Sequence, residues 1–220
     1  FGIGNHLATS ISLVRGSHIE RDQILAYRFD NQAEQSRAAN SNPVKAYVFS
    51  DDGDPARAAH LLTILRRHNI PVYPLNNDIY AGKQAFKKGH AYVVKLEGQQ
   101  YALITSLFES RTKFEDNVFY DISSWNLPLA FNLPYAPLKN LTNIGQSPLD
   151  APAPFTPKNW DGEKPVAYAF EWNQFRAPHL LQTLIEAKLY PRVSVKSITS
   201  KTRDHGKYKF AAGTILIQPS

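Results

Sequence analysis

The chain has no cysteine and no methionine among its 220 residues. Without cysteine it can form no disulfide, bind no metal through thiolates and use no cysteine nucleophile. The lack of thiols suits an oxidising compartment. No apolar run approaches the roughly 18 residues of a membrane span, and no signal peptide pattern is present. We therefore expect no membrane span. Because the chain begins at Phe1 instead of methionine, we expect it to be a processed chain or a piece of a longer protein.

Common catalytic motifs are also missing. The sequence has no Gly-x-Ser-x-Gly nucleophile elbow and no phosphate loop ending in Gly-Lys-Ser/Thr. Its seven histidines form no His-x-x-x-His, His-x-His or His-x-x-Glu pattern. We assign no catalytic residue, no metal ligand and no cofactor to this chain from these patterns.

Charge and composition indicate an ordinary folded protein. Apolar residues make up 43% and charged residues 20% of the chain, which is close to globular averages. Lysine and arginine exceed aspartate and glutamate by 25 to 19, a net charge of +6. The basic residues are scattered along the sequence, whereas nucleic-acid binders concentrate them on one face with aromatic residues between them. We therefore favour a solvated surface and expect no nucleic-acid partner.

A sequence unit occurs twice, once in the first half of the chain and once in its last quarter. Tyr47 and Tyr168 lie 121 residues apart in similar apolar strands, and His60 and His179, each followed by Leu-Leu, lie 119 residues apart. A third pair, Phe86 to Gly89 and Phe210 to Gly213, has an offset of 124. Fixed offsets of this kind are typical of an internal repeat. We expect the shared residues, including both histidines, to serve the same structural role in each copy.

Local patterns predict the elements of the first copy. A β-branched and aromatic run over 44–49 predicts a strand, and the turn residues 51–54 before Pro55 predict a helix from about 55 to 68. A second strand is expected at 70–73, and a hairpin around 97–99. Helical spacing of apolar residues from His6 to about Ala38 predicts a long amphipathic helix, weakened in the middle by Gly16.

From these elements we predict an α/β fold with two related strand-helix-strand units around a mostly parallel sheet, preceded by the long N-terminal amphipathic helix. The expected organisation has four parts. They are the N-terminal helix at 1–40, the first repeat with an aromatic segment at 41–133, a proline-rich connector at 134–164 and the second repeat at 165–220. The two repeats are expected to pack together as one domain.

Acidic residues follow the first strand of each repeat. Asp51, Asp52 and Asp54 follow the first, and Glu171 follows its counterpart. In open α/β sheets such loops line the ligand crevice, so these four residues are the binding candidates, for a cationic group or a metal ion. Helix capping by aspartate is the alternative, which we favour. The aromatic residues Trp125 and Phe119 could stack a glycan or peptide, although core packing is the more common role.

Several segments together resemble the region after the catalytic domain of large bacterial zinc carboxypeptidase-like proteins, relatives of carboxypeptidase A. They are Phe119 to Leu129, the two repeat openings at 46–49 and 167–170, and Gly213 to Ile217. In addition, Gly4 to Ser10 with Arg21 to Leu25 resembles the helix that ends the peptidase domain of that family.

The resemblance implies an accessory α/β domain similar in fold to class I glutamine amidotransferases, whose catalytic cysteine this chain lacks. It implies that the peptidase domain of the same polypeptide is the partner, that zinc is bound only there, and that the protein is periplasmic or secreted. Whether this chain is an enzyme is left open, since no catalytic residue of the family can be placed in it. The alternative function is a module that binds a small molecule, peptide or glycan.

Overall fold

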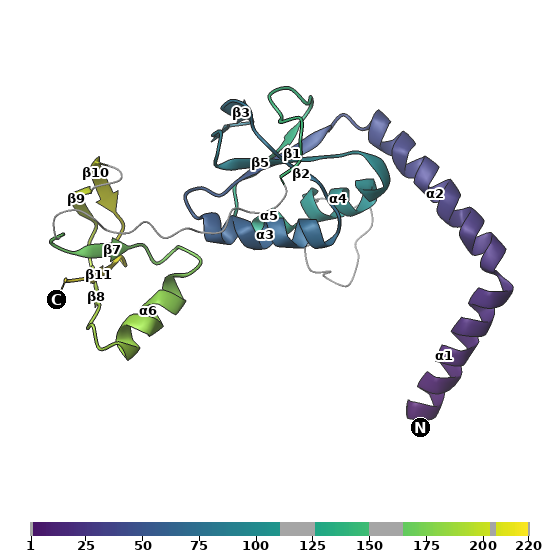
Figure 1. The fold of residues 1–220 in the computed structure, drawn as a ribbon, viewed down its shortest axis with the longest axis horizontal. Helices are drawn as coiled ribbons and strands as arrows, with labels where there is room; N and C mark the ends of the chain where they lie inside the picture. The colour runs from purple at the N-terminus through teal and green to yellow at the C-terminus, as the bar shows by residue number, and fades with distance from the viewer. Residues whose placement is uncertain (1, 111–125, 150–164, 203–205, 220) are drawn as a thin grey trace, which may run out of the picture.

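The computed structural model describes residues 2–110, 126–149, 165–202 and 206–219. It is a mixed α+β protein (Figure 1). The helices are α1 (Gly2–Ile19), α2 (Arg21–Ser41), α3 (Pro55–Arg67), α4 (Tyr101–Phe108), α5 (Leu127–Ala130) and α6 (Ala177–Glu186), with a 3-10 turn at Gly98–Gln100. The strands are β1 (Ala46–Ser50), β2 (Val72–Pro74), β3 (Ile79–Ala81), β4 (Gln84–Phe86), β5 (Ala91–Lys95), β6 (Tyr135–Leu138), β7 (Tyr168–Phe170), β8 (Arg192–Val193), β9 (Ile198–Thr202), β10 (Gly206–Phe210) and β11 (Ile215–Ile217).

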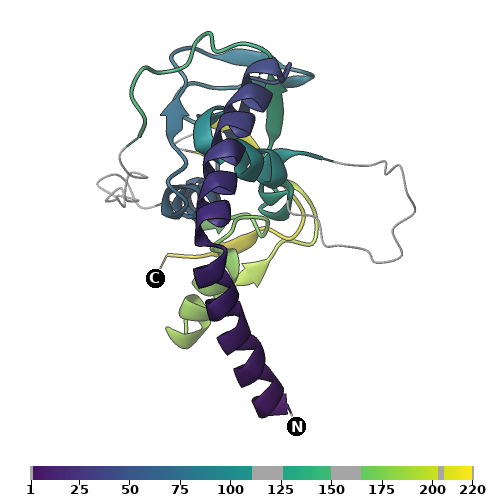
Figure 2. The same cartoon turned by 90° about the vertical axis from the view of Figure 1, so that its right-hand side faces the viewer.

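The N-terminal segment forms two helices where we predicted one. Helix α1 ends at Ile19 and α2 begins at Arg21, with Glu20 between them at φ −93° and ψ 12°. Backbone hydrogen bonds still cross the junction, from the Glu20 amide to the Gly16 carbonyl and from the Ile24 amide to the Glu20 carbonyl. The junction is therefore a bend one turn after Gly16. Figures 1 and 2 show α1 extending away from the rest of the protein.

The central sheet is antiparallel, so the predicted mostly parallel sheet is wrong. Its strand order is β2-β5-β1-β6, and each neighbouring pair runs antiparallel. Strands β1 and β2, which helix α3 connects, do run in the same direction. They are not neighbours, because β5 lies between them and pairs with both. The prediction failed because it assumed that strands joined by a helix also pair with each other.

Both faces of the central sheet are covered. On one face Tyr47 and Phe49 pack with the buried leucines of α3 and with Ile104 and Phe108 of α4. On the other face Val48 and Val93 pack with residues of the β3-β4 hairpin and of the loop after β6. Because side chains alternate along a strand, successive residues of β1 belong in turn to one cluster and to the other. All five residues of β1 are buried, which makes it the centre of the core.

The second copy repeats the order of elements in the first copy. The series β7, α6, β8, the β9-β10 hairpin and β11 corresponds to β1, α3, β2, the β3-β4 hairpin and β5. Strand order corresponds as well, since β11 lies between β7 and β8 as β5 lies between β1 and β2. All pairs in this second sheet are antiparallel. We call these two groups of elements the first unit (46–95) and the second unit (168–217).

Some other predictions need correction. The expected hairpin around 97–99 is wrong, because residues 98–100 form a 3-10 turn that leads into helix α4. Within the expected connector, residues 135–138 form strand β6 of the central sheet. Trp125, Phe119 and residues 150–164 lie outside the described residues. The expected start of α3 is confirmed: the helix begins at Pro55 with Asp54 as its N-cap.

None of the helices in the described residues is long and apolar enough to cross a membrane.

Candidate functional site

The first candidate, Asp51, is a buried carboxylate at the end of β1. Only 3% of its surface is exposed. Its two carboxylate oxygens lie 3.2 and 3.3 Å from Nδ1 of His90, and Oδ1 also accepts a hydrogen bond from the Gly53 amide. The Asp51 amide donates to the His90 carbonyl. Asp51 therefore ties the loop after β1 to the residue before β5, and protein groups contact both of its oxygens.

Asp54 holds the start of helix α3 and also contacts the second unit. Its Oδ1 accepts from the Arg57 amide at 3.1 Å, which is an N-cap hydrogen bond. Its Oδ2 accepts from the Phe175 amide at 2.6 Å and lies 3.3 Å from Nε of Arg57. The other candidate in this loop, Asp52, is exposed and has a φ of 46°, a left-handed conformation that aspartate tolerates in turns.

Arg57 and His60 extend this contact between the units, which we call the inter-unit contact (Asp54, Arg57, His60, Asn173 and Phe175). The Arg57 guanidinium donates to the carbonyls of Asn173 and Asn132. The His60 ring lies 4.5 Å from the Phe175 ring, measured between centroids. The sequence analysis missed Arg57, Asn173 and Phe175 in this role. No local signal could reveal it, because the two partners are more than 110 residues apart.

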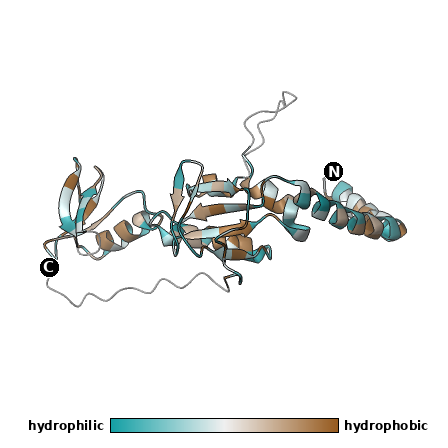
Figure 3. Ribbon diagram, turned by 90° about the horizontal axis from the view of Figure 1, so that it is seen from above, coloured by the Kyte–Doolittle hydropathy of each residue, from teal (hydrophilic) through white to brown (hydrophobic). Residues whose placement is uncertain are grey.

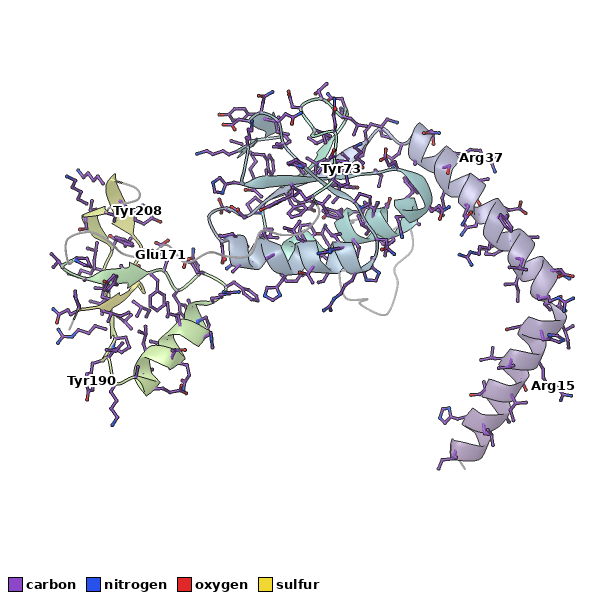
Figure 4. All side chains as sticks on the ribbon, in the orientation of Figure 1. Arg15, Arg37, Tyr73, Glu171, Tyr190 and Tyr208 are labelled. Atoms are coloured by element: carbon purple, nitrogen blue, oxygen red, sulfur yellow. The ribbon has the colours of Figure 1, made fainter. Side chains whose placement is uncertain are left out.

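Glu171 is held within the second unit. Its Oε2 accepts from the Tyr208 hydroxyl at 3.0 Å, and its Oε1 accepts from the Ala211 amide at 3.2 Å. Figure 4 shows Tyr208 on β10 close to Glu171 at the end of β7. The hydrogen bond to Glu171 is the main cause that raises the pKa of Tyr208, with smaller contributions from burial and from the carboxylate charge. The hydroxyl can donate only while it is protonated.

Three of the four acidic candidates therefore have separate structural partners. Asp51 contacts His90, Asp54 contacts Arg57 and Phe175, and Glu171 contacts the β10 region. In the part of the chain that the structure describes, no group of three or more His, Cys, Asp or Glu residues is arranged to hold a metal ion. The helix-capping interpretation holds for Asp54. Ligand binding by the four residues stays a prediction.

The two repeated histidines have different surroundings. The His60 ring contacts the Phe175 ring at a tilt of 45° in the inter-unit contact. His179, at the matching place in α6, is exposed, and its backbone carbonyl accepts from the Thr183 hydroxyl. The expectation of one shared structural role for this pair is wrong, because only the first copy has the other unit packed against its helix.

Asn126 is a buried polar residue that the sequence analysis overlooked. Its side-chain amide donates to the carbonyls of Phe108 and Glu109, and its oxygen accepts from the Leu129 amide as the N-cap of α5. It lies 2.8 Å from the Tyr135 hydroxyl as well. The Asn-Leu-Pro sequence at 126–128 was an available signal, since asparagine and then proline often begin a helix. Asn126 joins α4, α5 and β6.

A hollow with a mostly apolar lining lies at the bend between the N-terminal helices. Its volume is about 690 Å³, and its lining includes Ala8, Leu13, Gly16 and Ile24. Every residue of α1 is exposed or only partly covered.

Comparison with known proteins gave no match to a family model, to a curated protein or to a solved structure.

Proposed function

We propose that this chain is an accessory, non-catalytic domain of a zinc carboxypeptidase-like protein, and that its N-terminal helices pack against the peptidase domain of the same polypeptide. The observation that carries the proposal is the exposure of large apolar side chains along α1 and the first half of α2. These side chains are 50 to 88% exposed and belong to Ile3, Leu7, Ile11, Leu13, Val14, Ile19, Ile24, Leu25, Tyr27 and Phe29.

The apolar residues of α1 lie on more than one side of the helix. Ile3, Leu7, Ile11 and Val14 follow helical spacing along one face, whereas Leu13 lines the hollow at the bend. Figure 3 shows hydrophobic segments on both N-terminal helices. A helix that is apolar on several sides is typical of a buried helix. Such a helix gains most from a partner that surrounds it, and within the described residues no side chain of α1 is buried.

The energetics also favour a partner. Isolated helices become marginal in water at about 12–15 residues because helix nucleation is costly, and in proteins the packing of an apolar face supplies most of the stability of a helix. Full burial of one leucine or isoleucine side chain stabilises by about 1.5–3 kcal/mol. Full burial of Ile3, Leu7, Ile11 and Val14 would therefore supply about 6–12 kcal/mol. This gain is comparable with the about 4–15 kcal/mol that association costs in lost freedom.

The sequence indicates which partner this is. Gly4 to Ser10 and Arg21 to Leu25 resemble the helix that ends the peptidase domain of zinc carboxypeptidase-like proteins, and they lie within α1 and the start of α2. The exposed helices and the peptidase-like segment are therefore the same part of the chain. The end of α2 is anchored to the start of α4, because Gln35 accepts from the Ala102 amide and Asn42 donates to the Tyr101 hydroxyl.

The proposal is tested by comparing this chain with a longer version of the protein that includes the segment before Phe1. Hydrogen exchange should be fast in α1 of the chain alone and at least about tenfold slower in the longer protein. The longer protein should retain zinc after dialysis and release C-terminal residues from peptides, whereas the chain alone should do neither. Equal exchange of α1 in both proteins, or stoichiometric zinc with turnover in the chain alone, would contradict the proposal.

A pair of variants shows whether the apolar face is responsible. In the longer protein, Leu7→Gln with Ile11→Gln should lower the melting temperature, because polar amides would be buried at the contact. The matched control is Tyr80→Gln with Val195→Gln, which changes two exposed apolar residues away from the helices. The control should melt within about 2 °C of the unchanged protein. Equal melting of both variants would remove the docking argument.

A further inference from the structure

The positive charge of the chain is concentrated in its last quarter. Residues 166–220 contain eight lysine and arginine residues and three acidic residues, which gives +5 of the total net charge of +6. The preceding 165 residues contain 17 basic and 16 acidic residues and are nearly neutral. Spacing along the sequence does not show this charge as a patch, because the basic residues are separated by others.

The β9-β10 hairpin brings three of these lysines onto one face. In the antiparallel register Lys207 lies directly opposite Lys201, and Lys209 lies opposite Thr199. Residues that face each other across an antiparallel pair point to the same side, and so do residues two apart along a strand. Lys201, Lys207, Lys209 and Thr199 therefore share a face, which we call the lysine face.

Burial shows that the lysine face points to solvent. Its four residues are exposed, whereas Ile198, Tyr208 and Phe210 on the other face are partly buried. Tyr208 donates to Glu171, and its ring packs edge-on against Phe210 at 4.7 Å. A hollow of about 430 Å³ adjoins the hairpin, with Lys201 and Lys207 in its lining. The inward face fixes the hairpin on the second unit and so fixes the direction of the lysines.

The arrangement has a cost that an anion would relieve. Like charges directly opposite each other in a strand pair are destabilising. No ion pair neutralises Lys201, Lys207 or Lys209 among the residues that the structure describes. The corresponding β3-β4 hairpin pairs Ile79 with Phe86 and has no lysine opposite another. The lysine pair is therefore a feature of the second unit and not of the repeat.

We propose that the lysine face binds a ligand that carries several phosphate groups. Lysine ammonium groups bind phosphates as point charges. The separation of paired positions on such a face is about 5 to 7 Å, which suits successive anionic groups better than a single ion. The face consists of lysine and threonine and offers no aromatic ring on which a base could stack. The phosphates could belong to a soluble polyanion or to lipid headgroups, which share this chemistry.

Binding is measured for the whole chain with two probes, inorganic polyphosphate in solution and vesicles that contain phosphatidylglycerol. Vesicles of phosphatidylcholine serve as the uncharged comparison. Affinity should fall as salt is raised, because salt screens exposed charges. Binding of polyphosphate assigns the phosphates to a soluble ligand, and binding of the anionic vesicles alone assigns them to a membrane surface. Binding to neither probe at low salt would overturn the proposal.

Matched variants separate the lysine face from the net charge. Lys201→Gln with Lys207→Gln should weaken binding about thirtyfold, since each lysine near an anionic surface raises the affinity about fivefold. Lys83→Gln with Lys87→Gln removes the same charge around the β3-β4 hairpin, and binding should change by about twofold or less. Equal losses in both variants would reduce the effect to net charge and overturn the proposal.

Stability provides the remaining check. Because the lysine pair is repulsive, Lys201→Gln with Lys207→Gln should melt at the same temperature as the unchanged chain or slightly higher. If this double variant does not fold, Lys209→Gln alone replaces it, with an expected loss of about fivefold in affinity. Unchanged binding by a folded Lys209→Gln variant would then contradict the proposal. The outcome is independent of the peptidase domain, so it does not depend on the proposed accessory role.

Discussion

The first and second units share their order of strands but differ in what covers them. Two elements from outside the first unit cover it: β6 pairs with β1, and α4 packs over the sheet. In the described part of the second unit β7 pairs with β11 alone. The consequence is visible at one repeated residue, since Tyr47 is 7% exposed and Tyr168 is 45% exposed.

This difference teaches that a repeated sequence pattern specifies connections better than it specifies a core. Tyr47 is buried because the Phe108 ring stacks on it at 5.1 Å, and Phe108 also packs against Phe49. Phe108 belongs to α4, which lies outside the repeat. The first unit therefore owes its core to a segment that is not duplicated.

The largest expected effect is on stability when the repeated tyrosines are removed in turn. Tyr47→Ala should lower the free energy of unfolding by about 3–5 kcal/mol, as for other buried aromatic residues. Tyr168→Ala should lower it by about 1 kcal/mol or less, because the side chain is half exposed. Urea unfolding followed by circular dichroism measures both. Phe108→Ala should resemble Tyr47→Ala, and similar losses for the two tyrosines would remove the contrast between the units.

A smaller effect is expected at the inter-unit contact. Asp54→Ala removes the N-cap of α3 and the acceptor of the Phe175 amide, and should cost about 1–2 kcal/mol. Asp54→Asn keeps a good N-cap and should cost about half as much. Hydrogen exchange at Phe175 should become faster in the alanine variant. If exchange there is unchanged, Asp54 serves α3 alone and does not join the units.

The smallest effect is a pH dependence confined to the second unit. The pKa of Tyr208 is raised, chiefly by its hydrogen bond to Glu171. The folded state therefore favours the protonated hydroxyl. This stabilisation is complete below the ordinary pKa of 10.0 and is lost as the pH rises through the higher folded pKa. In an ultraviolet titration, the number of tyrosines with a raised pKa should be one smaller in the Glu171→Gln variant than in the unchanged chain. Identical titration curves would exclude the hydrogen bond as the cause.

Local elements were predictable from the sequence, whereas their pairing was not. Turn residues, the Asp54 cap and Pro55 correctly placed the start of α3. The sheet was mispredicted because nothing local shows that β5 inserts between β1 and β2. Residues 101–104 were predicted as the second strand of a hairpin, although Ile104 and Phe108 have the i, i+4 spacing of a helix. A short apolar run fits both a strand and a helix, so its pattern alone does not decide between them.

The candidate site shows the same limit. The sequence indicated that Asp51, Asp54 and Glu171 follow strands, but not what they contact. His90, which contacts Asp51, lies 39 residues away, and Phe175, which donates to Asp54, lies 121 residues away. Such partners are set by the fold. The lysine face was hidden for a related reason, because only the register of β9 with β10 places Lys201 opposite Lys207.

Hydrogen exchange along the two equivalent strands tests the central difference most directly. Amides of β1 should be among the slowest in the chain, because β5 and β6 pair with both edges of that strand. Amides of β7 should exchange at least about a hundredfold faster in the same sample, because one edge of β7 is paired among the described residues. Equal protection of residues 47–49 and 168–170 would contradict the account that only the first unit has a complete core.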